Sequence, residues 1–570
     1  MADETANRVN TNTADMATSE QEREMILSAR QRGPLAVLGA YTRLSGPGWL
    51  QSAITLGGGS LGGALYLGVL GGLSFMWLQP LAMIMGVIML SAIAFVTLST
   101  GERPFQAINR NVSPVLGWGW AIATLMANLV WAMPQFSLGT AAVQQNLIPS
   151  LDGSGGSWAI GLFFLIVTSG VVFMYDKGSK GIKAFEIVLK VMVGIIVVSF
   201  FAVVFKMTMK GALDWGAIFS GLIPKPGMLF APSATIQQAI DACAPEYREF
   251  WTGLWMDSLR KVVITAVATA VGINMTFLLP YSMLKKRWDK DFRGLAIFDL
   301  STGLFIPFVL ATGCVVIAAA TQFHGAPDAS YQNGQLVNPP ASVTANAVKR
   351  VKADANFIAS IDGLSAEEQK ARIGEQVAAL PAADKKMAAL LVKRNADTLA
   401  NSLKPVTGQF FAQKVFGIGV LGMAISTIII LMLINGFTVC EMLGLESKGA
   451  PYLIACLLPG LSGFAGAMLW GAAVPFWLVV PTSNFGMVLL PVAYFTFLLL
   501  MNNKRMLGDK LPSGNARLAW NLLMIIAAVL SGICSVYVLW SNLKYKGIAL
   551  LVVFTLAALA TRPRHNDAKV

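Results

Sequence analysis

Long apolar runs constrain the fold of this 570-residue chain more than any other feature of its sequence. About twelve of them reach the roughly 18 to 20 residues with which an α-helix crosses a bilayer. They occupy residues 47–71, 74–99, 115–143, 157–175, 182–206, 259–284, 294–321, 411–438, 451–472, 478–501, 518–541 and 547–561. Only 13% of the residues are charged, against about 25% in soluble proteins. We therefore expect an all-α integral membrane protein with about twelve transmembrane helices.

Lysine and arginine residues indicate the orientation of the chain. Cationic clusters follow the fourth, sixth and tenth runs at residues 177–183, 285–293 and 504–510, whereas the loop 144–157 has no lysine or arginine. Because cationic loops stay in the cytoplasm, and an even number of spans puts both termini on one side, we expect cytoplasmic termini and a cell (inner or plasma) membrane location. The same distribution accounts for the net charge of +13. The lipid bilayer is therefore the expected surrounding, and no nucleic acid is expected as a partner.

The runs and the polar segments between them divide the chain into five regions. These are a cytoplasmic N-terminal arm (1–43), a first transmembrane part with helices 1–7 (44–321) that includes an outer loop at 207–258, an extracytoplasmic insertion (322–407), a second transmembrane part with helices 8–12 (408–561) and a cytoplasmic tail (562–570). Within the insertion, Ser365 and Glu368 have the spacing of a capping box, which predicts the start of a helix. We expect a small helical cap over the outer face, serving as a lid, a spacer or a surface for a protein partner.

The first apolar run is interrupted near its middle. Its segment 52–72 is SAITLGGGSLGGALYLGVLGG, in which Gly57, Gly58 and Gly59 follow one another. A glycine costs a helix about 1 kcal/mol relative to alanine, so three in a row predict a broken helix. Non-helical backbone survives at bilayer depth only where protein or a water-filled cavity satisfies its polar groups, and such breaks bind the cargo of secondary transporters.

The sixth run is the expected counterpart of the first. If spans 1–5 and 6–10 are inverted repeats, their broken first helices face each other at the membrane midplane. The segment 272–282, GINMTFLLPYS, then supplies the second half of the site, with Gly272 and Pro280 on either side of the polar residues Asn274 and Thr276.

Four segments of the sequence carry a resemblance to a known family. They are GPGWL at 46–50, LGTA at 138–141, FRGLAIFDLSTGLFIPFVL at 292–310 and LLPVAYFTFLLLMNNKRMLGD at 489–509. Together they resemble the NRAMP (natural resistance-associated macrophage protein) family of divalent-metal transporters. The resemblance implies the LeuT-like fold of the APC superfamily, with 5+5 inverted repeats. It also implies secondary transport of a divalent metal ion by alternating access around broken helices 1 and 6.

The chain departs from this family at the positions that the resemblance assigns to the metal. The family's Asp-Pro-Gly-Asn falls on Gly57, Gly58, Gly59 and Ser60, and its Met-Pro-His falls on Asn274, Met275 and Thr276. A shift of one residue would make Met275 the thioether ligand, but the histidine is missing in either register. We take these seven residues as the candidate substrate-binding set and assign no metal ligand among them.

The missing carboxylate leaves the nature of the cargo open. A divalent ion held by carbonyls and hydroxyls alone would lack a counter-charge in a low-dielectric cavity. Free N–H groups at the start of a half-helix favour an anion, so a small, anionic organic solute is the alternative cargo, moved with Na⁺ or without it. Ser426 and Thr427 resemble the hydroxyl pair of sodium-coupled members of the fold, unless they bond back to their own helix. Asn128 and Gln135 in span 3 either line the cavity or join helices.

Two further expectations concern function classes and histidines. A non-transporting sensor or scaffold, with the cap recruiting a partner, is a second alternative. An enzyme is not expected, because the spans contain no nucleophile with a base, no phosphate loop and no cluster of metal ligands. No cofactor is expected besides a coupling Na⁺. His324 and His565 lie outside the spans and are expected to be solvated.

Overall fold

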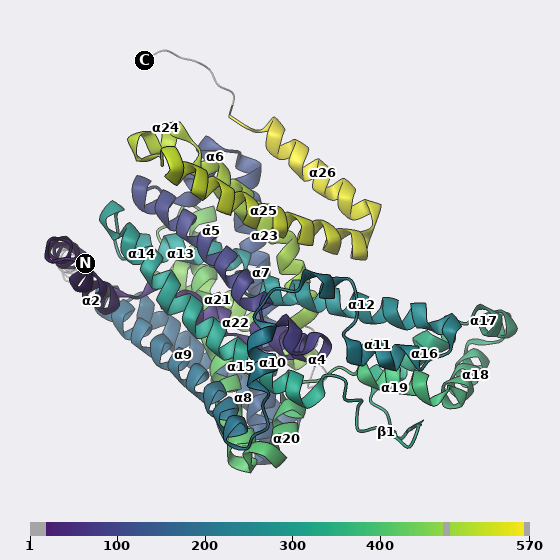
Figure 1. The fold of residues 1–570 in the computed structure, drawn as a ribbon. Helices are drawn as coiled ribbons and strands as arrows, with labels where there is room; N and C mark the ends of the chain where they lie inside the picture. The colour runs from purple at the N-terminus through teal and green to yellow at the C-terminus, as the bar shows by residue number, and fades with distance from the viewer. Residues whose placement is uncertain (1–18, 471–478, 564–570) are drawn as a thin grey trace.

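The computed structural model describes residues 19–470 and 479–563, and it is almost entirely helical (Figure 1). Among these residues, eleven helices are long and apolar enough to cross a membrane. One further apolar helix, α26 (Tyr545–Ala560), has 16 residues. At 1.5 Å per residue it spans about 24 Å, less than the roughly 30 Å of a hydrocarbon core. The expected all-α membrane architecture is confirmed.

The helices of the first part run in an order that the apolar runs largely predicted. They are α2 (Pro34–Leu44), α3 (Pro47–Thr55), α4 (Gly58–Gly71), α5 (Leu78–Thr100), α6 (Pro104–Asn111), α7 (Pro114–Ala141), α8 (Ser154–Tyr175), α9 (Gly178–Met209), α10 (Trp215–Gly221), α11 (Ala234–Asp241), α12 (Pro245–Ala268), α13 (Ile273–Lys285), α14 (Arg293–Asp299) and α15 (Ile306–Phe323). Short π-helical turns extend α7 and precede α15, at Ala142–Leu147 (η2) and Leu300–Phe305 (η6).

The insertion and the second part follow. They comprise the antiparallel strands β1 (Tyr331–Gln332) and β2 (Gln335–Leu336), then α16 (Ala341–Lys352), α17 (Ala355–Ile361), α18 (Ala366–Ala379), α19 (Ala382–Leu390), α20 (Ala396–Thr407), η7 (Phe410–Val415), α21 (Phe416–Met442), α22 (Gly449–Trp470), α23 (Val479–Met501), α24 (Lys504–Leu507), α25 (Gly514–Leu543) and α26. Helix α21 is buried along almost its whole length and packs on α7, α22 and α9, so it forms the centre of the bundle.

Spans 1 and 6 are each broken into two helices. Span 1 stops at Thr55 and resumes at Gly58, and span 6 stops at Ala268 and resumes at Ile273. The second half of each span follows a glycine in extended backbone, with φ −124° and ψ −176° in span 1 and φ −88° and ψ 163° in span 6. The glycine triplet therefore marks the first break, although two of its residues already belong to α4. The second break lies at 269–272, at the start of the predicted segment.

The outer loop and the insertion are more helical than the hydropathy pattern indicates. The predicted loop 207–258 is shorter, because α9 continues to Met209 and α12 already begins at Pro245. Charged residues in the first turns of α12 hide this extension from a hydropathy count. In the insertion, the capping box is present, since the Glu368 backbone N–H donates to Ser365 Oγ at 3.3 Å and the Ser365 N–H donates to Glu368 Oε2 at 3.0 Å.

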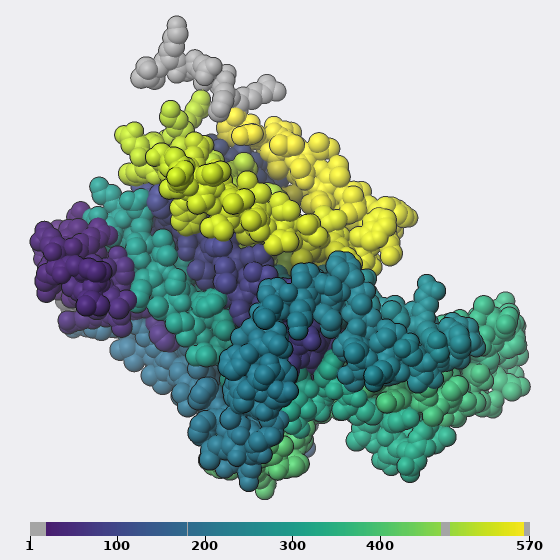
Figure 2. Space-filling view, viewed as in Figure 1, coloured from purple at the N-terminus to yellow at the C-terminus, as the bar shows by residue number. Residues whose placement is uncertain are grey.

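Helices α16 to α19 of the insertion project as a lobe from the bundle, on the side away from α2, whereas α20 packs against the bundle (Figures 1 and 2). Buried polar contacts attach the lobe to the first turns of α12. Asp384 Oδ1 accepts a hydrogen bond from Trp251 Nε1 at 2.6 Å and forms an ion pair with Arg350 Nε at 2.9 Å. The Tyr66 hydroxyl of α4 donates to the Arg394 carbonyl at 2.6 Å. The insertion is thus fastened to one half of each broken helix.

A network of charges closes the opposite end of the bundle. The Asp299 carboxylate caps α3, accepting from the Gly46 N–H at 3.0 Å and the Gly48 N–H at 2.6 Å. Glu186 of α9 pairs with Lys286, which follows α13, at 3.1 Å. The Asp299 contacts hold the start of α3 to the end of α14, and the Glu186–Lys286 pair joins α9 to the end of α13.

The N-terminal arm contributes a helix at residues 19–32 to this end. Arg23 Nε forms an ion pair with Asp291 Oδ2 at 2.7 Å, so the helix is held to the loop after α13. Residues 1–18 of the predicted arm, and most of the predicted tail 562–570, lie outside the described residues. His565 belongs to that part.

Replacing Lys286 with methionine is expected to destabilise this closed end by about 3 kcal/mol, because it leaves the buried Glu186 carboxylate without its partner. Thermal unfolding in detergent measures the effect. Arg372→Met is the matched control, because its pair with Glu375 is exposed and contributes little. Equal melting temperatures for the two variants would contradict the structural role of the Glu186–Lys286 pair.

His324 differs from its expectation, because both ring nitrogens are engaged. Nδ1 lies 3.0 Å from the Val69 carbonyl and Nε2 lies 3.0 Å from Ser233 Oγ, so the ring joins the end of α15 to α4 and to the outer loop. The expectation of a solvated His324 is therefore wrong. The Val69 carbonyl only accepts hydrogen bonds, and the neutral tautomer that carries its proton on Nδ1 satisfies it.

Burial lowers the pKa of His324 below its usual value of 6.5. The stability that the neutral ring contributes is complete above pH 6.5 and is lost as the pH falls below it. We expect the melting temperature to drop between pH 7 and pH 5, and the drop to shrink in His324→Gln. An identical pH profile for the variant and the parent would contradict this expectation.

Candidate functional site

A cavity of about 40 Å³ lies where the two helix breaks meet. Since a bound water needs roughly 10–15 Å³ of such space, the cavity has room for one small ion or a few waters. Its lining comes from both broken spans and from α7, α21 and α23, and comprises Ile54, Thr55, Gly57, Gly59, Ser60, Ala127, Trp131, Gln135, Ala268, Thr269, Gly272, Ile273, Asn274, Met275, Thr427, Leu431 and Gly486.

At the break in span 1, side chains take up the first backbone N–H groups of α4. The Gly57 N–H donates to Ser60 Oγ at 3.2 Å, and the Ser60 hydroxyl donates back to the Gly57 carbonyl at 3.0 Å. The Gly58 N–H donates to Gln135 Oε1 of α7 at 2.9 Å. The donors that would attract an anion to Gly57 and Gly58 are therefore already engaged.

The glycines of this break are required by space. A Cβ on Gly57 would lie 2.2 Å from Thr427 Oγ1, and a Cβ on Gly59 would lie 2.5 Å from the Trp131 ring. Real Cβ atoms do not approach other atoms so closely. The glycines let α7 and α21 come into direct contact with the break.

At the break in span 6, the Met275 sulfur is the central group. Sδ accepts from the Thr55 hydroxyl at 3.1 Å and from the Gly272 N–H at 3.4 Å, so it connects the two breaks. The Met275 N–H donates to Asn274 Oδ1 at 3.0 Å, which caps α13 with a side chain as well.

Four predicted site residues, Gly58, Thr276, Asn128 and Ser426, lie outside the cavity lining. Gly58 does not line the cavity, and its N–H is bonded to Gln135. Thr276 points into the helix packing, where its hydroxyl donates to the Ile273 carbonyl at 2.5 Å and accepts from Trp120 Nε1 at 2.9 Å. Asn128 is fully buried in α7, and neither its oxygen nor its nitrogen has a hydrogen-bond partner among the described residues.

The structure separates the two hydroxyls of span 8. Ser426 Oγ bonds back to the Met423 carbonyl at 3.3 Å, one turn earlier in α21. Thr427 faces the break, with Oγ1 at 3.5 Å from the Ile54 carbonyl. Gln135 combines the two alternatives, because it lines the cavity and its Oε1 also joins α7 to α4.

Sequence reasoning missed two lining residues of consequence, Thr55 and Trp131. Thr55 is the last residue of α3, so its hydroxyl lies directly before the glycine break, which is a signal that could have singled it out. Trp131 fills the space opposite Gly59, and a large aromatic ring against a glycine is not visible before the packing is known.

The cavity is polar without being charged, since none of its lining residues is Asp, Glu, Lys, Arg or His. No group of three or more His, Cys, Asp or Glu side chains that could hold a metal ion occurs in the described ranges. Helices α3 and α12 end at the cavity with carbonyl groups, and the dipole of a helix places roughly half a negative charge at such an end. Helices α4 and α13 start at the cavity with N–H groups. Side chains satisfy the N–H groups of Gly57, Gly58 and Met275, so at these three positions an anion finds no free backbone donor.

The family model described as "Natural resistance-associated macrophage protein-like" matches residues 48–339 and 378–541. The match covers most of the chain and includes both helix breaks. The chain belongs to this family. As an Nramp-like protein it is a multi-pass secondary transporter of the divalent-metal type, and it is not an enzyme. Among curated proteins, no relative matches the chain.

Solved structures agree with this Nramp-like assignment at the level of the fold. Two structures of the Eremococcus coleocola manganese transporter, a histidine-to-alanine mutant and a complex with an aromatic bis-isothiourea substituted compound, are similar to the chain with TM-scores of 0.58 and 0.59. Each is 12% identical in sequence to this protein, and each match covers 92% of this protein and 93% of the manganese transporter chain. The LeuT-like fold expected from the sequence is confirmed.

Proposed function

We propose that this Nramp-like transporter binds its divalent cation in the cavity between the two helix breaks. The observation that carries the proposal is the direction of the hydrogen bonds at the breaks. The N–H groups of Gly57, Gly58 and Met275 are capped by side chains, which leaves carbonyl, hydroxyl and thioether groups facing the cavity. Carbonyl and thioether groups only accept, and a hydroxyl can turn a lone pair toward a cation, so this set suits a cation better than a carboxylate.

The ligands that we assign are the Ile54 carbonyl, the hydroxyls of Thr55 and Thr427, and the Met275 sulfur. The ion would replace the hydrogen of the Thr55–Met275 bond, because both of these atoms could then turn a lone pair toward it. A thioether favours softer ions and oxygen ligands favour Mn²⁺ or Mg²⁺, so the mixed set favours a transition-metal ion over Mg²⁺. Without a carboxylate, the ion is expected to keep part of its water shell.

The orientation follows from charges at the closed end. The N-terminal helix and the cationic segment after α13 lie together, since Arg23 pairs with Asp291. By the positive-inside rule we place this end, and with it both termini, in the cytoplasm of a cell membrane. The cavity then loads from the side of the insertion, and release requires opening of the Glu186–Lys286 and Asp299 contacts.

Uptake into liposomes that contain the purified protein tests the proposal. One enclosed dye reports Mn²⁺ and another reports Mg²⁺. Saturable uptake of Mn²⁺, faster than that of Mg²⁺, is the expected result. Saturable flux of a small organic anion without any metal flux would support the organic-solute alternative instead, and no flux of either kind would support a sensor or scaffold.

An inward Na⁺ gradient imposed on the same vesicles tests coupling. We infer no sodium requirement, because only Thr427 of the predicted hydroxyl pair faces the break. Faster uptake in sodium than in potassium, lost in Thr427→Ala, would overturn this inference.

A further inference from the structure

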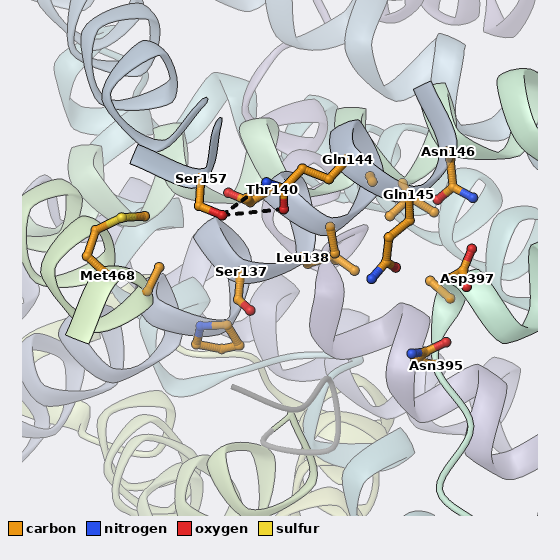
Figure 3. Close-up of a pocket in the computed structure, with 16 residues that line it drawn as sticks. Ser137, Leu138, Thr140, Gln144, Gln145, Asn146, Ser157, Asn395, Asp397 and Met468 are labelled. Carbon is orange, nitrogen blue, oxygen red and sulfur yellow. Dashed lines mark hydrogen bonds between the residues drawn. The ribbon is translucent and has the colours of Figure 1, made fainter. Parts of the chain in front are cut away.

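A second cavity, of about 130 Å³, lies between the end of α7, α21, α22 and the start of α20 (Figure 3). It is at the end of the bundle that carries the insertion. Its polar lining joins Ser137, Thr140, Gln145 and Asn146 of α7 and η2 with Asn395 and Asp397 of the insertion. The insertion thus places a carboxylate over the outer end of the transport domain.

We propose that this outer cavity is a capture site for a hydrated divalent cation, with Asp397 as its charged group. The proposal rests on the proposed cation cargo. Asp397 supplies the negative charge that the cavity between the breaks lacks. An ion that keeps its first water shell needs a fixed carboxylate and amide or hydroxyl oxygens around it, which is the lining observed here.

A chain of amide side chains holds Asp397 in place. Asn401 Nδ2 donates to Asp397 Oδ2, Gln413 Nε2 donates to Asn401 Oδ1, and Asn146 Nδ2 donates to Gln413 Oε1, each at 2.9 Å. Every donor in the chain points toward the carboxylate. These hydrogen bonds link the insertion to the start of α21 and to the end of α7, so the position of Asp397 is fixed relative to the transport domain.

The charges around Asp397 leave it available to a cation. Burial raises the pKa of its carboxyl group, which a bound cation would reverse by favouring the ionised form. Two lysines are nearby. Lys414 Nζ is taken up by backbone carbonyls, those of Leu147 at 2.5 Å and Asn146 at 3.3 Å, and Lys404 lies two turns further along α20 and attracts Asp397 through space.

Thr140 gives an independent indication of a ligand. Its side chain lines the cavity and the residue is only 7% exposed, yet its hydroxyl has no hydrogen-bond partner among the described residues. Other buried threonines of the bundle bond back to their own helix, as Thr168 does at 2.7 Å and Thr312 does at 2.7 Å. A water of a hydrated ion would supply the partner that Thr140 lacks.

The outer cavity is next to the cavity between the breaks. Leu138 lines the outer cavity, and Gln135, one turn earlier on α7, lines the other. A Cβ on Gly58 would lie 2.8 Å from Leu138 Cδ2, so these two residues separate the cavities. An ion captured at Asp397 would have to pass the contact between Leu138 and Gly58 to reach the cavity between the breaks.

Asp397→Asn in the full chain tests the proposal, with MnCl2 as the probe. Electron paramagnetic resonance of the detergent-solubilised protein is expected to show two classes of bound Mn²⁺ in the parent and one in the variant. In liposomes, the KM for Mn²⁺ is expected to rise roughly ten-fold with little change in kcat, as loss of a capture site that acts before the transport step requires. Asp362→Asn, an exposed residue of the same insertion, is the control and should match the parent.

A second variant keeps the test decisive if Asp397→Asn folds poorly. Thr140→Val keeps the shape of the side chain and removes the hydroxyl, and it should raise the KM in the same direction by a smaller factor. Parent-like KM and two classes of Mn²⁺ in either folded variant would overturn the capture site while leaving the cation cargo intact. A parent without bound Mn²⁺ and without Mn²⁺ uptake would instead overturn the proposed function, and the capture site with it.

Discussion

Replacement of Gly57 by alanine is expected to reduce Mn²⁺ uptake roughly ten-fold or more. The added Cβ would lie 2.2 Å from Thr427 Oγ1 and 3.1 Å from the Ile54 carbonyl, two of the groups that we assign to the ion. Inserting one carbon into a packed site costs about 1–3 kcal/mol, and α21 can yield only by moving away from the break. Uptake into liposomes, at equal amounts of folded protein, measures the loss.

Two comparisons separate this effect from general damage. Gly194→Ala in α9 adds the same carbon to a membrane helix where nothing lies within 4 Å, and it should transport like the parent. Thr427→Ala removes the atom that lies closest to the added Cβ, so the double variant Gly57→Ala/Thr427→Ala should lose less uptake than the sum of the two single losses. A strictly additive loss in the double variant would show that Gly57 and Thr427 do not meet as the structure indicates.

Replacement of Met275 by leucine is expected to lower Cd²⁺ uptake roughly ten-fold, to lower Mn²⁺ uptake by a smaller factor and to leave Mg²⁺ uptake nearly unchanged. The exchange conserves volume, so its cost to stability is below about 1.5 kcal/mol, while it removes the sulfur that a softer ion prefers. The ratio of Cd²⁺ to Mg²⁺ uptake is the informative quantity, because a change in folded protein cancels in it.

Met283→Leu is the matched control for this change. Met283 lies on the same helix and is fully buried, but it does not line the cavity. It should keep the parent ratio of Cd²⁺ to Mg²⁺ uptake. If Met275→Leu also keeps that ratio, the thioether is not a ligand and the ion must be held by oxygens alone.

Much of the architecture could be predicted because short stretches of sequence determine it locally. The apolar runs gave the spans, and three consecutive glycines gave the break in span 1, since no other residue bends a helix so cheaply. The start of α12 could not be predicted from hydropathy, because its first turns lie outside the apolar run. Its buried partner Asp384 is more than a hundred residues away in the sequence.

The polarity of the site was the harder part. From the sequence, the N–H groups at Gly57 and Gly58 looked free, which suggested an anion. In the structure, Ser60 caps one of them and Gln135 the other, and the second contact joins residues 77 positions apart. Likewise, Met275 and Thr276 are neighbours in the sequence, but the Met275 side chain lines the cavity and the Thr276 side chain lies between packed helices. The direction of such side chains depends on how the helices pack, which the sequence alone does not show.

Anomalous diffraction from crystals grown with Cd²⁺ tests the central claim most directly, because it locates the ion. A Cd²⁺ peak between the two helix breaks, bonded to the Met275 sulfur and to the Ile54 carbonyl or the Thr427 hydroxyl, and absent in Met275→Leu crystals, is the predicted result. Crystals of transport-competent protein in which Cd²⁺ lies elsewhere in the membrane domain, with only water between the breaks, would contradict it.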